Sequence, residues 1–181
     1  MPTYVAFLRA INLGPTRKFP KADIVTATGA AGCSDVETYI NTGNVRLTSG
    51  LRSRAKVEAS LEKAYAAQTG FAVPTLVFTP AELAEIAADA EELTRPDLER
   101  HYLYLLKDEP AKDRVDALLA KEGAADQVVV RGRAVHLLFG SGYQPGSVDP
   151  WGVEKALGVV ATNRNFNVVT TLAKKWCSPS G

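Results

Sequence analysis

The stretch VETYINTGNVRLTS, residues 36–49, decides the fold, because it contains two short strands and the turn that joins them. Residues 36–41 and 44–49 are bounded by turn-forming residues and hold the Val, Ile, Thr and Tyr side chains that favour strands. Thr42 and Gly43 lie between the two runs, and glycine can adopt the positive φ that a tight hairpin turn requires. The stretch therefore predicts an antiparallel β-hairpin.

The elements on either side of this hairpin complete a known unit. A strand is predicted over residues 3–9, and a helix runs from Pro20 to Ala31 and ends at Gly32. After the hairpin come a helix over 53–69 and a strand over 73–79. The order is βαββαβ, which is that of the ferredoxin-like unit.

The same order begins again in the second half. Thr79, Pro80 and Glu82 mark the start of a connecting helix, and Arg95-Pro96 is a break. The elements that follow are a strand over 101–107, a helix over 110–122, a hairpin around Gly132, a helix opened by Asp149-Pro150, and a last helix over 162–175. The predicted fold class is α+β with two ferredoxin-like halves, the second ending in helices instead of a final strand. The predicted domains are a first half (1–79), a connecting helix and linker (80–97), and a second half with C-terminal helices (98–181).

Composition places the chain among ordinary soluble proteins. Its 181 residues are 46% hydrophobic and 23% charged, enough to bury a core. No apolar run approaches the ~20 residues that a membrane helix needs, and the N-terminus leads straight into a strand-like run, so no membrane segment or secretory signal is expected. Cys33 and Cys177 lie far apart and show no metal-type spacing. These features predict a cytoplasmic protein without a metal or a cofactor.

The net charge of +1 is unevenly distributed along the chain. Residues 1–79 and 127–181 each carry a net charge of +4, and residues 80–126 carry −7. Such asymmetry can set a basic face against an acidic one. In the acidic block, however, the charges alternate with Leu, Ile and Ala at helical spacing, which favours solvated helices over a docking surface.

Three stretches resemble an uncharacterised bacterial family known only as domain of unknown function 1697. FLRAINLGP (7–15) resembles its opening pattern F-L-R-G-I-N-V-G-G, YINTGNV (39–45) its hairpin pattern Y-I-Q-S-G-N-V, and TNRNFNV (162–168) its C-terminal pattern T-x-R-N-W-N-T. The resemblance implies an α+β fold of ferredoxin-like halves and no established activity. The chain departs from the patterns at Ala10, Pro15, Thr42, Phe166 and Val168, and the first two of these replace glycines. The positions that the resemblance nominates are Arg9, Asn12, Gly43, Asn44, Thr162, Arg164, Asn165 and Asn167.

The start of the predicted last helix carries an unusual charge. Thr162 is expected to be its N-cap, and Arg164 would then lie in a first turn that already carries partial positive charge. A bound anion would offset that cost, with Asn165 and Asn167 as neutral donors. The hypothesis is a shared pocket of Arg9, Asn12, Arg164 and Asn167 for a phosphate or carboxylate group. The alternative for Arg164 is pairing with an acidic residue elsewhere.

The candidate ligand-binding residues are Arg9, Asn12, Lys18, Asn44, Thr162, Arg164, Asn165 and Asn167. A structural salt bridge is an equal alternative for Arg9, and turn capping is the favoured alternative for Asn44. His101 and His136 have no cysteine or carboxylate near them in sequence that would indicate a metal or catalytic site. The loop GSGYQPGS (140–147) lacks the spacing of a nucleotide-binding motif and favours an ordinary connection.

Three functions remain open from the sequence. The first is binding of a small anionic ligand, with nucleic acid as a weaker version because the pI of 7.7 is modest. The second is a small enzyme that acts on an anionic substrate without a metal or a covalent nucleophile. The third is a protein–protein adaptor that uses the acidic block 80–126. The oligomeric state is left open.

Overall fold

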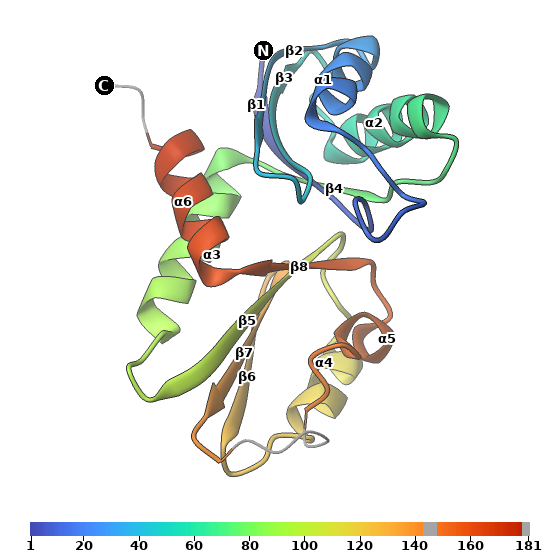
Figure 1. Cartoon of the computed structure of the whole chain (residues 1–181). Helices are drawn as coiled ribbons and strands as arrows, with labels where there is room; N and C mark the ends of the chain where they lie inside the picture. The colour runs from blue at the N-terminus through green and yellow to red at the C-terminus, as the bar shows by residue number, and fades with distance from the viewer. Residues whose placement is uncertain (143–147, 179–181) are drawn as a thin grey trace. The chain divides into compact units, whose positions relative to one another are not determined.

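The computed structural model describes residues 1–142 and 148–178, and the chain divides into two compact units. Unit 1 holds Met1–Leu83 and the C-terminal residues from Trp176, and unit 2 holds Ala84–Lys175. Each unit contains one four-stranded antiparallel sheet (Figure 1). Most of the predicted loop 140–147 lies outside the described residues. No helix among the described residues is long and apolar enough to cross a membrane.

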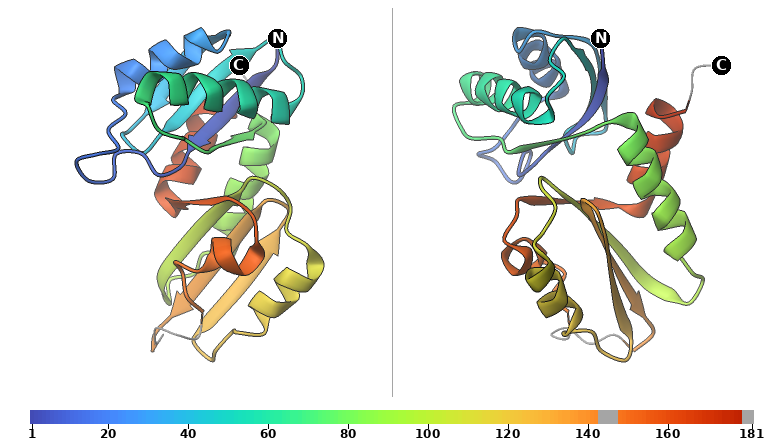
Figure 2. Two further views of the ribbon diagram at one scale, coloured as in Figure 1. Left: turned by 90° about the vertical axis from the view of Figure 1, so that its right-hand side faces the viewer. Right: turned by 180° about the vertical axis from the view of Figure 1, so that it is seen from behind.

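Unit 1 has the predicted βαββαβ order, and its strands lie in the order β2-β3-β1-β4. Helices α1 and α2 cover one face of this sheet (Figure 2). Tyr4, Ala6 and Leu8 of the central strand β1 belong to the buried core on that face, together with Val57 and Leu61 of α2. The elements are β1 (Thr3–Leu8), α1 (Lys21–Ala30), β2 (Cys33–Tyr39), β3 (Asn44–Ser49), α2 (Arg54–Thr69) and β4 (Thr75–Phe78).

Unit 2 repeats this arrangement with the strand order β6-β7-β5-β8. Its core lies between the sheet and the helices α4 and α5, and includes Leu106, Leu137, Phe139 and Leu157. Helix α3 lies beside α6, and a 3.9 Å ion pair joins Lys174 to Glu91 (Figures 1 and 2). The elements are α3 (Pro80–Leu93), β5 (Leu98–Leu106), α4 (Lys112–Leu119), β6 (Asp126–Arg131), β7 (Ala134–Gly140), α5 (Val153–Leu157), β8 (Ala161–Asn165) and α6 (Phe166–Trp176).

The two ferredoxin-like halves are confirmed, but one detail of the second half is corrected. A strand, β8, precedes the last helix, and it pairs antiparallel with β5 over Tyr102–Leu106. The expectation that a helix takes the place of the final strand is therefore wrong. Its sequence, ATNRN, has no apolar alternation, because two of the three side chains that the strand buries, those of Thr162 and Arg164, are polar. Pairing with β5 overrides the weak strand propensity of these residues.

Carboxylates on the second helix of each half bind the edge strand beside it. Glu62 Oε1 and Glu58 Oε1 of α2 accept hydrogen bonds from Thr75 N and Val77 N of β4, at 2.9 and 3.0 Å. Glu154 Oε2 of α5 accepts one from Ala161 N of β8, at 3.1 Å. Backbone N–H groups on the edge of a sheet need partners when they are not paired with another strand. In both halves, therefore, glutamates of the second helix accept hydrogen bonds from backbone N–H groups of the adjacent edge strand.

Candidate functional site

Two of the resemblance motifs meet in unit 1, where the chain leaves β1 and where the β2–β3 hairpin turns. We call these segments the β1 exit loop (residues 9–19) and the hairpin turn (residues 40–43). Leu8 N donates to Gly43 O at 2.8 Å, and Asn12 Nδ2 donates to Asn41 O at 2.7 Å. A Cβ on Gly43 would lie 2.7 Å from Leu8 Cβ and 2.9 Å from Ile11 Cδ1. The two segments are therefore in direct contact, and only glycine fits at their closest approach.

Asn12 and Arg17 hold the β1 exit loop in shape. Asn12 Oδ1 accepts from Phe19 N at 2.9 Å, and its backbone N–H donates to Arg17 O at 2.7 Å. Arg17 donates from Nε to Ala10 O at 2.6 Å, and its guanidinium carbon lies 4.4 Å from the centre of the Phe71 ring. The charge of Arg17 is thus used to brace the loop, and Arg9 and Lys18 are the other two cations of the loop.

The backbone of both segments is strained. Four non-glycine residues of the described chain have positive φ, and three of them lie here: Ala10 (57°), Asn12 (54°) and Ile40 (50°). Positive φ costs free energy for any residue with a Cβ, and it is a genuine outlier for a β-branched one. The family pattern has glycine at position 10, which is the residue type that this conformation favours. Strain of this kind collects at functional sites.

Asn44 and Lys18 differ in their surroundings. Asn44 is fully buried, and its Nδ2 donates to Tyr39 O at 3.0 Å and to Thr42 Oγ1 at 2.9 Å. These two bonds are the ones expected if Asn44 caps the hairpin turn instead of binding a ligand. Lys18 is exposed, and it makes no hydrogen bond or ion pair with any described residue. Arg9 follows β1 directly and is half-buried, with its backbone N–H bonded to Pro74 O.

The other four candidate residues belong to unit 2, and their local structure corrects the expected helix start. Thr162 and Arg164 lie in β8 rather than in the first turn of a helix. The N-cap of α6 is Asn165, whose Oδ1 accepts from Val168 N at 2.8 Å. Asn167 is exposed in the first turn of α6. Arg164 therefore does not oppose a helix dipole, and it does not share a helix face with Asn167.

Arg164 is buried in the sheet of unit 2. Its Nη1 group donates to Thr162 Oγ1 and to Asn163 O, each at 2.8 Å. Burial lowers the pKa of its guanidinium to about 10. Its strand pairing with Leu103 places it on the sheet face opposite α4 and α5. Because Arg9 and Asn12 belong to unit 1, the shared pocket of these residues with Arg164 and Asn167 stays a prediction.

Two histidines that are distant in sequence meet on the same sheet face as Arg164. His101 Nε2 lies 3.2 Å from His136 Nδ1, and His101 also packs against Phe166 with ring centroids 5.6 Å apart. Burial and the neighbouring His101 lower the pKa of His136 to about 4, so it is neutral at physiological pH. Sequence alone could not reveal the pair, because strand register brings the two residues together. No group of three potential ligands for a metal ion occurs among the described residues.

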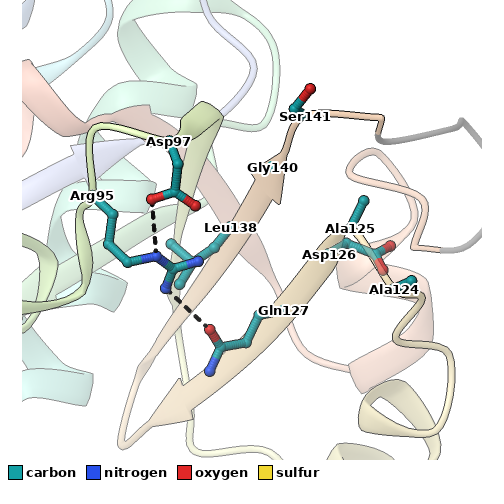
Figure 3. A pocket seen from close by; sticks show the side chains of 9 residues that line it. All are labelled: Arg95, Asp97, Ala124, Ala125, Asp126, Gln127, Leu138, Gly140 and Ser141. Carbon is teal, nitrogen blue, oxygen red and sulfur yellow. Dashed lines mark hydrogen bonds and ion pairs between the residues drawn. The ribbon is translucent and has the colours of Figure 1, made fainter.

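A cavity of about 400 Å³ opens at one end of the sheet in unit 2 (Figure 3). Arg95 bridges to Asp97 Oδ1 and to Gln127 Oε1, each at 3.4 Å, and the side chain of Asp126 points away from Arg95. Arg95 and Asp97 are both well exposed, so their attraction is screened by solvent. No motif in the sequence indicated this cavity. Arg95, Asp97 and Gln127 bond to one another, whereas Asp126 Oδ1 accepts from Gly123 N and the buried Asp126 Oδ2 has no hydrogen-bond partner among the described residues. This lining does not by itself define a ligand.

The acidic block 80–126 is partly neutralised within unit 2. Asp89 and Glu92 of α3 both pair with Arg131, Asp116 pairs with Lys112, and Glu91 pairs with Lys174. The pairs with Arg131 and Lys174 tie α3 to the sheet and to α6, and the pair of Lys112 with Asp116 lies within α4. They reduce the acidic surface that a protein partner could recognise.

Comparison with known proteins places the chain by family and fold. Residues 1–136 match the family model described as Protein of unknown function (DUF1697). The match includes the first two motifs and ends before the third. No curated protein matches the chain. The solved structure of the conserved bacterial protein SP0830 from Streptococcus pneumoniae is similar, with a TM-score of 0.67 at 21% identity over 96% of this chain and 99% of that one. At this identity the similarity concerns the fold.

Proposed function

We propose that this chain, which belongs to the family Protein of unknown function (DUF1697), binds a small anionic ligand at the β1 exit loop and the hairpin turn of unit 1. The ligand would carry a phosphate or carboxylate group. The participation of Thr162, Arg164, Asn165 and Asn167 stays a prediction, since these residues belong to unit 2.

The observation that carries the proposal is the concentration of backbone strain in two adjoining segments. Ala10, Asn12 and Ile40 each hold a conformation that costs of the order of 1–3 kcal/mol. Left-handed residues within turns are also the conformation from which backbone anion-binding nests are built. Bonds from Asn12 and Arg17 maintain the strain in the β1 exit loop. Such bracing fits a loop whose shape is needed for recognition.

The local charge supports an anion over a neutral ligand. Arg9, Arg17, Lys18 and Lys21 all precede Asp23, the first acidic residue of the chain. Arg17 donates to two carbonyl oxygens, whereas Lys18 is exposed, so Lys18 would supply the charge that the ligand meets first, and Arg9 would add to the local positive potential. Hydrogen bonds to charged groups contribute more free energy than neutral ones, so removing either cation should weaken binding measurably.

An enzyme acting on an anionic substrate remains the alternative, and it would need the same bound anion. Binding is therefore the first property to measure. Isothermal titration calorimetry with inorganic phosphate and inorganic pyrophosphate tests it directly, using wild-type protein, Arg9→Gln and Lys18→Ala. Lys56→Ala, which removes an exposed lysine from α2, is the matched control.

We expect pyrophosphate to bind, and we expect each of the two loop variants to weaken binding about tenfold while the control does not. Equal affinity in Lys18→Ala and in Lys56→Ala would show that the loop is not the site. If neither anion binds to the wild-type protein, the proposal is rejected for phosphate-bearing ligands. Titration with citrate in the same way tests whether a carboxylate-bearing ligand binds.

A further inference from the structure

Unit 2 presents an exposed tryptophan beside its sheet. Trp151 is 75% exposed, and it is the one aromatic residue among the exposed large hydrophobic side chains of the described chain. Its ring meets that of Tyr102 of β5 in an edge arrangement, with centroids 6.1 Å apart. Leaving an indole in water forgoes the hydrophobic free energy of burying it, so a partner that covers it would gain that free energy.

The turn that carries Trp151 is fixed by several bonds. Trp151 N donates to Asp149 Oδ1 at 2.9 Å, and Gly152 N donates to Asp149 O at 3.1 Å. Tyr104 of β5 donates its hydroxyl to Pro150 O, which ties the turn to the sheet. A Cβ on Gly152 would lie 2.9 Å from Asp149 Oδ2, so the turn is closely packed. The backbone that carries the indole is fixed before any ligand arrives, which lowers the entropic cost of binding.

Strand register identifies the groups beside the indole. Arg100 lies two residues before Tyr102 in β5, beyond the bulge between Leu98 and Arg100, so both side chains leave the same face of the sheet. Asn165 of β8 lies directly opposite Tyr102 in the antiparallel pair. Arg100 and Asn165 are both exposed. One end of this face therefore presents an indole and a guanidinium together with the Nδ2 group of Asn165, whose Oδ1 caps α6.

These three groups match the parts of a nucleotide. A planar base can stack on an indole, a guanidinium can bind a phosphate with two parallel hydrogen bonds, and a side-chain amide N–H can donate to an acceptor on a base edge. Asp149, the nearest carboxylate in sequence, already accepts the backbone N–H of Trp151. A neutral sugar would use the indole but would gain little from the adjacent cation.

We propose that this face of unit 2 binds a mononucleotide, with the base on Trp151, the phosphate at Arg100 and Asn165 Nδ2 donating to the base edge. The site lies in unit 2 and does not depend on the anion site proposed for unit 1. A mononucleotide fits better than a nucleic-acid strand, because a strand uses successive aromatic platforms and Trp151 is the one exposed aromatic among the described residues.

The test uses the full chain and a purine and a pyrimidine probe, AMP and UMP. Trp151 and Trp176 are the two tryptophans, and Trp176 is buried, so quenching of tryptophan fluorescence by a bound base reports mainly on Trp151. We expect saturable quenching by AMP and by UMP. By calorimetry, Trp151→Ala should weaken AMP binding about tenfold, and unchanged thermal unfolding would show that the variant folds.

Separate probes assign the parts of the site. Arg100→Ala should weaken AMP binding about tenfold and leave adenosine binding unchanged, whereas Arg114→Ala, which removes an exposed arginine from α4, should change neither. Ribose 5-phosphate tests the contribution of the base, and Lys18→Ala tests whether AMP binds at the unit 1 site instead. The proposal is overturned if AMP does not bind, if Trp151→Ala binds AMP normally, if ribose 5-phosphate binds as well as AMP, or if Lys18→Ala alone abolishes AMP binding. The proposal would also be overturned if a short single-stranded oligonucleotide binds while neither AMP nor UMP binds.

Discussion

Gly43 is the residue on which the junction between the β1 exit loop and the hairpin turn depends most. Its φ is 80°, and a Cβ there would lie within 2.9 Å of both Leu8 and Ile11. Gly70, at the end of α2, has nearly the same φ of 78° but nothing within 4 Å of a built Cβ. The two glycines share a left-handed backbone conformation and differ in steric contact.

Replacing each of these glycines with alanine separates the two effects. We expect Gly70→Ala to cost about 1 kcal/mol of unfolding free energy, which is the cost of a left-handed alanine. Gly43→Ala should cost about 1–3 kcal/mol more, because the contacts with Leu8 and Ile11 force a backbone shift. Urea unfolding of both variants measures the difference, and equal losses would mean that the close approach at Gly43 is absent in solution.

His136 makes stability depend on pH. Burial and His101 lower its folded-state pKa to about 4, while in the unfolded chain it is near 6.5. Between about pH 4 and pH 6.5, the unfolded chain binds a proton at His136 that the folded protein does not bind. The contribution of His136 to the free energy of unfolding is therefore complete above about pH 6.5, and it is lost as the pH falls through about 4. The charged groups near the ring include Asp89 and Arg131, which act in opposite directions.

When the pH is lowered from about 7 to about 5, the free energy of unfolding should fall in both proteins. We expect it to fall less in His136→Phe than in the wild type, with a difference on the order of 1–2 kcal/mol. Urea unfolding of both proteins at the two pH values gives the difference, and carboxylates common to both cancel. Parallel pH dependences would show that His136 titrates normally in the folded protein.

At the level of elements, the sequence predicted the first half almost completely. Gly32 and Gly70 follow the ends of helices as expected. The hairpin turn contains Thr42-Gly43 but spans residues 40–43, and its first strand runs over Cys33–Tyr39 instead of the predicted 36–41. Strand β8 was missed for a physical reason. On the sheet face away from α4 and α5, its buried side chains are those of Thr162 and Arg164, which are polar and bond to each other, so the pattern of a buried strand never appears in the sequence. The candidate site was harder to predict from the sequence, because positive φ angles and the strand register that joins His101 to His136 arise only in the folded chain.

The start of α6 offers a direct test of the corrected element boundaries. Asn165 caps the helix through its Oδ1, whereas Asn167 is exposed in the first turn. Asn165→Ala should lower the free energy of unfolding by about 1 kcal/mol, and Asn167→Ala should change it by less than about 0.5 kcal/mol. Thermal or urea unfolding compares them, and a larger loss in Asn167→Ala would argue that the helix begins elsewhere.

The carboxylates that bind the edge strands give a second prediction at this scale. Glu58 is buried and accepts from Val77 N and from Arg54 Nη1. Glu58→Ala leaves a buried backbone N–H without its acceptor, so we expect a loss of about 1–3 kcal/mol in urea unfolding. Glu85→Ala, on the exposed face of α3, is the control and should be within about 0.5 kcal/mol of wild type. Equal effects would contradict the role of Glu58 in holding β4.

For the whole molecule, the ion pairs of α3 assign it to the second half. Asp89 and Glu92 pair with Arg131, and Glu91 pairs with Lys174. A fragment of residues 79–178 retains these pairs and all four strands of its sheet, whereas a fragment of residues 98–178 loses α3. We expect the longer fragment to melt more cooperatively and at a higher temperature in calorimetry. Identical melting would show that α3 contributes nothing to unit 2.

The central claim, that an anionic ligand binds at the β1 exit loop and the hairpin turn, is tested most directly by NMR. Isotope-labelled full-length protein is titrated with inorganic pyrophosphate while the backbone amide signals are followed. We expect saturable shifts concentrated in residues 9–19 and 40–43, and about tenfold higher pyrophosphate concentrations for the same shifts in Lys18→Ala. Saturable shifts confined to other parts of the chain, or none at all, would contradict this claim.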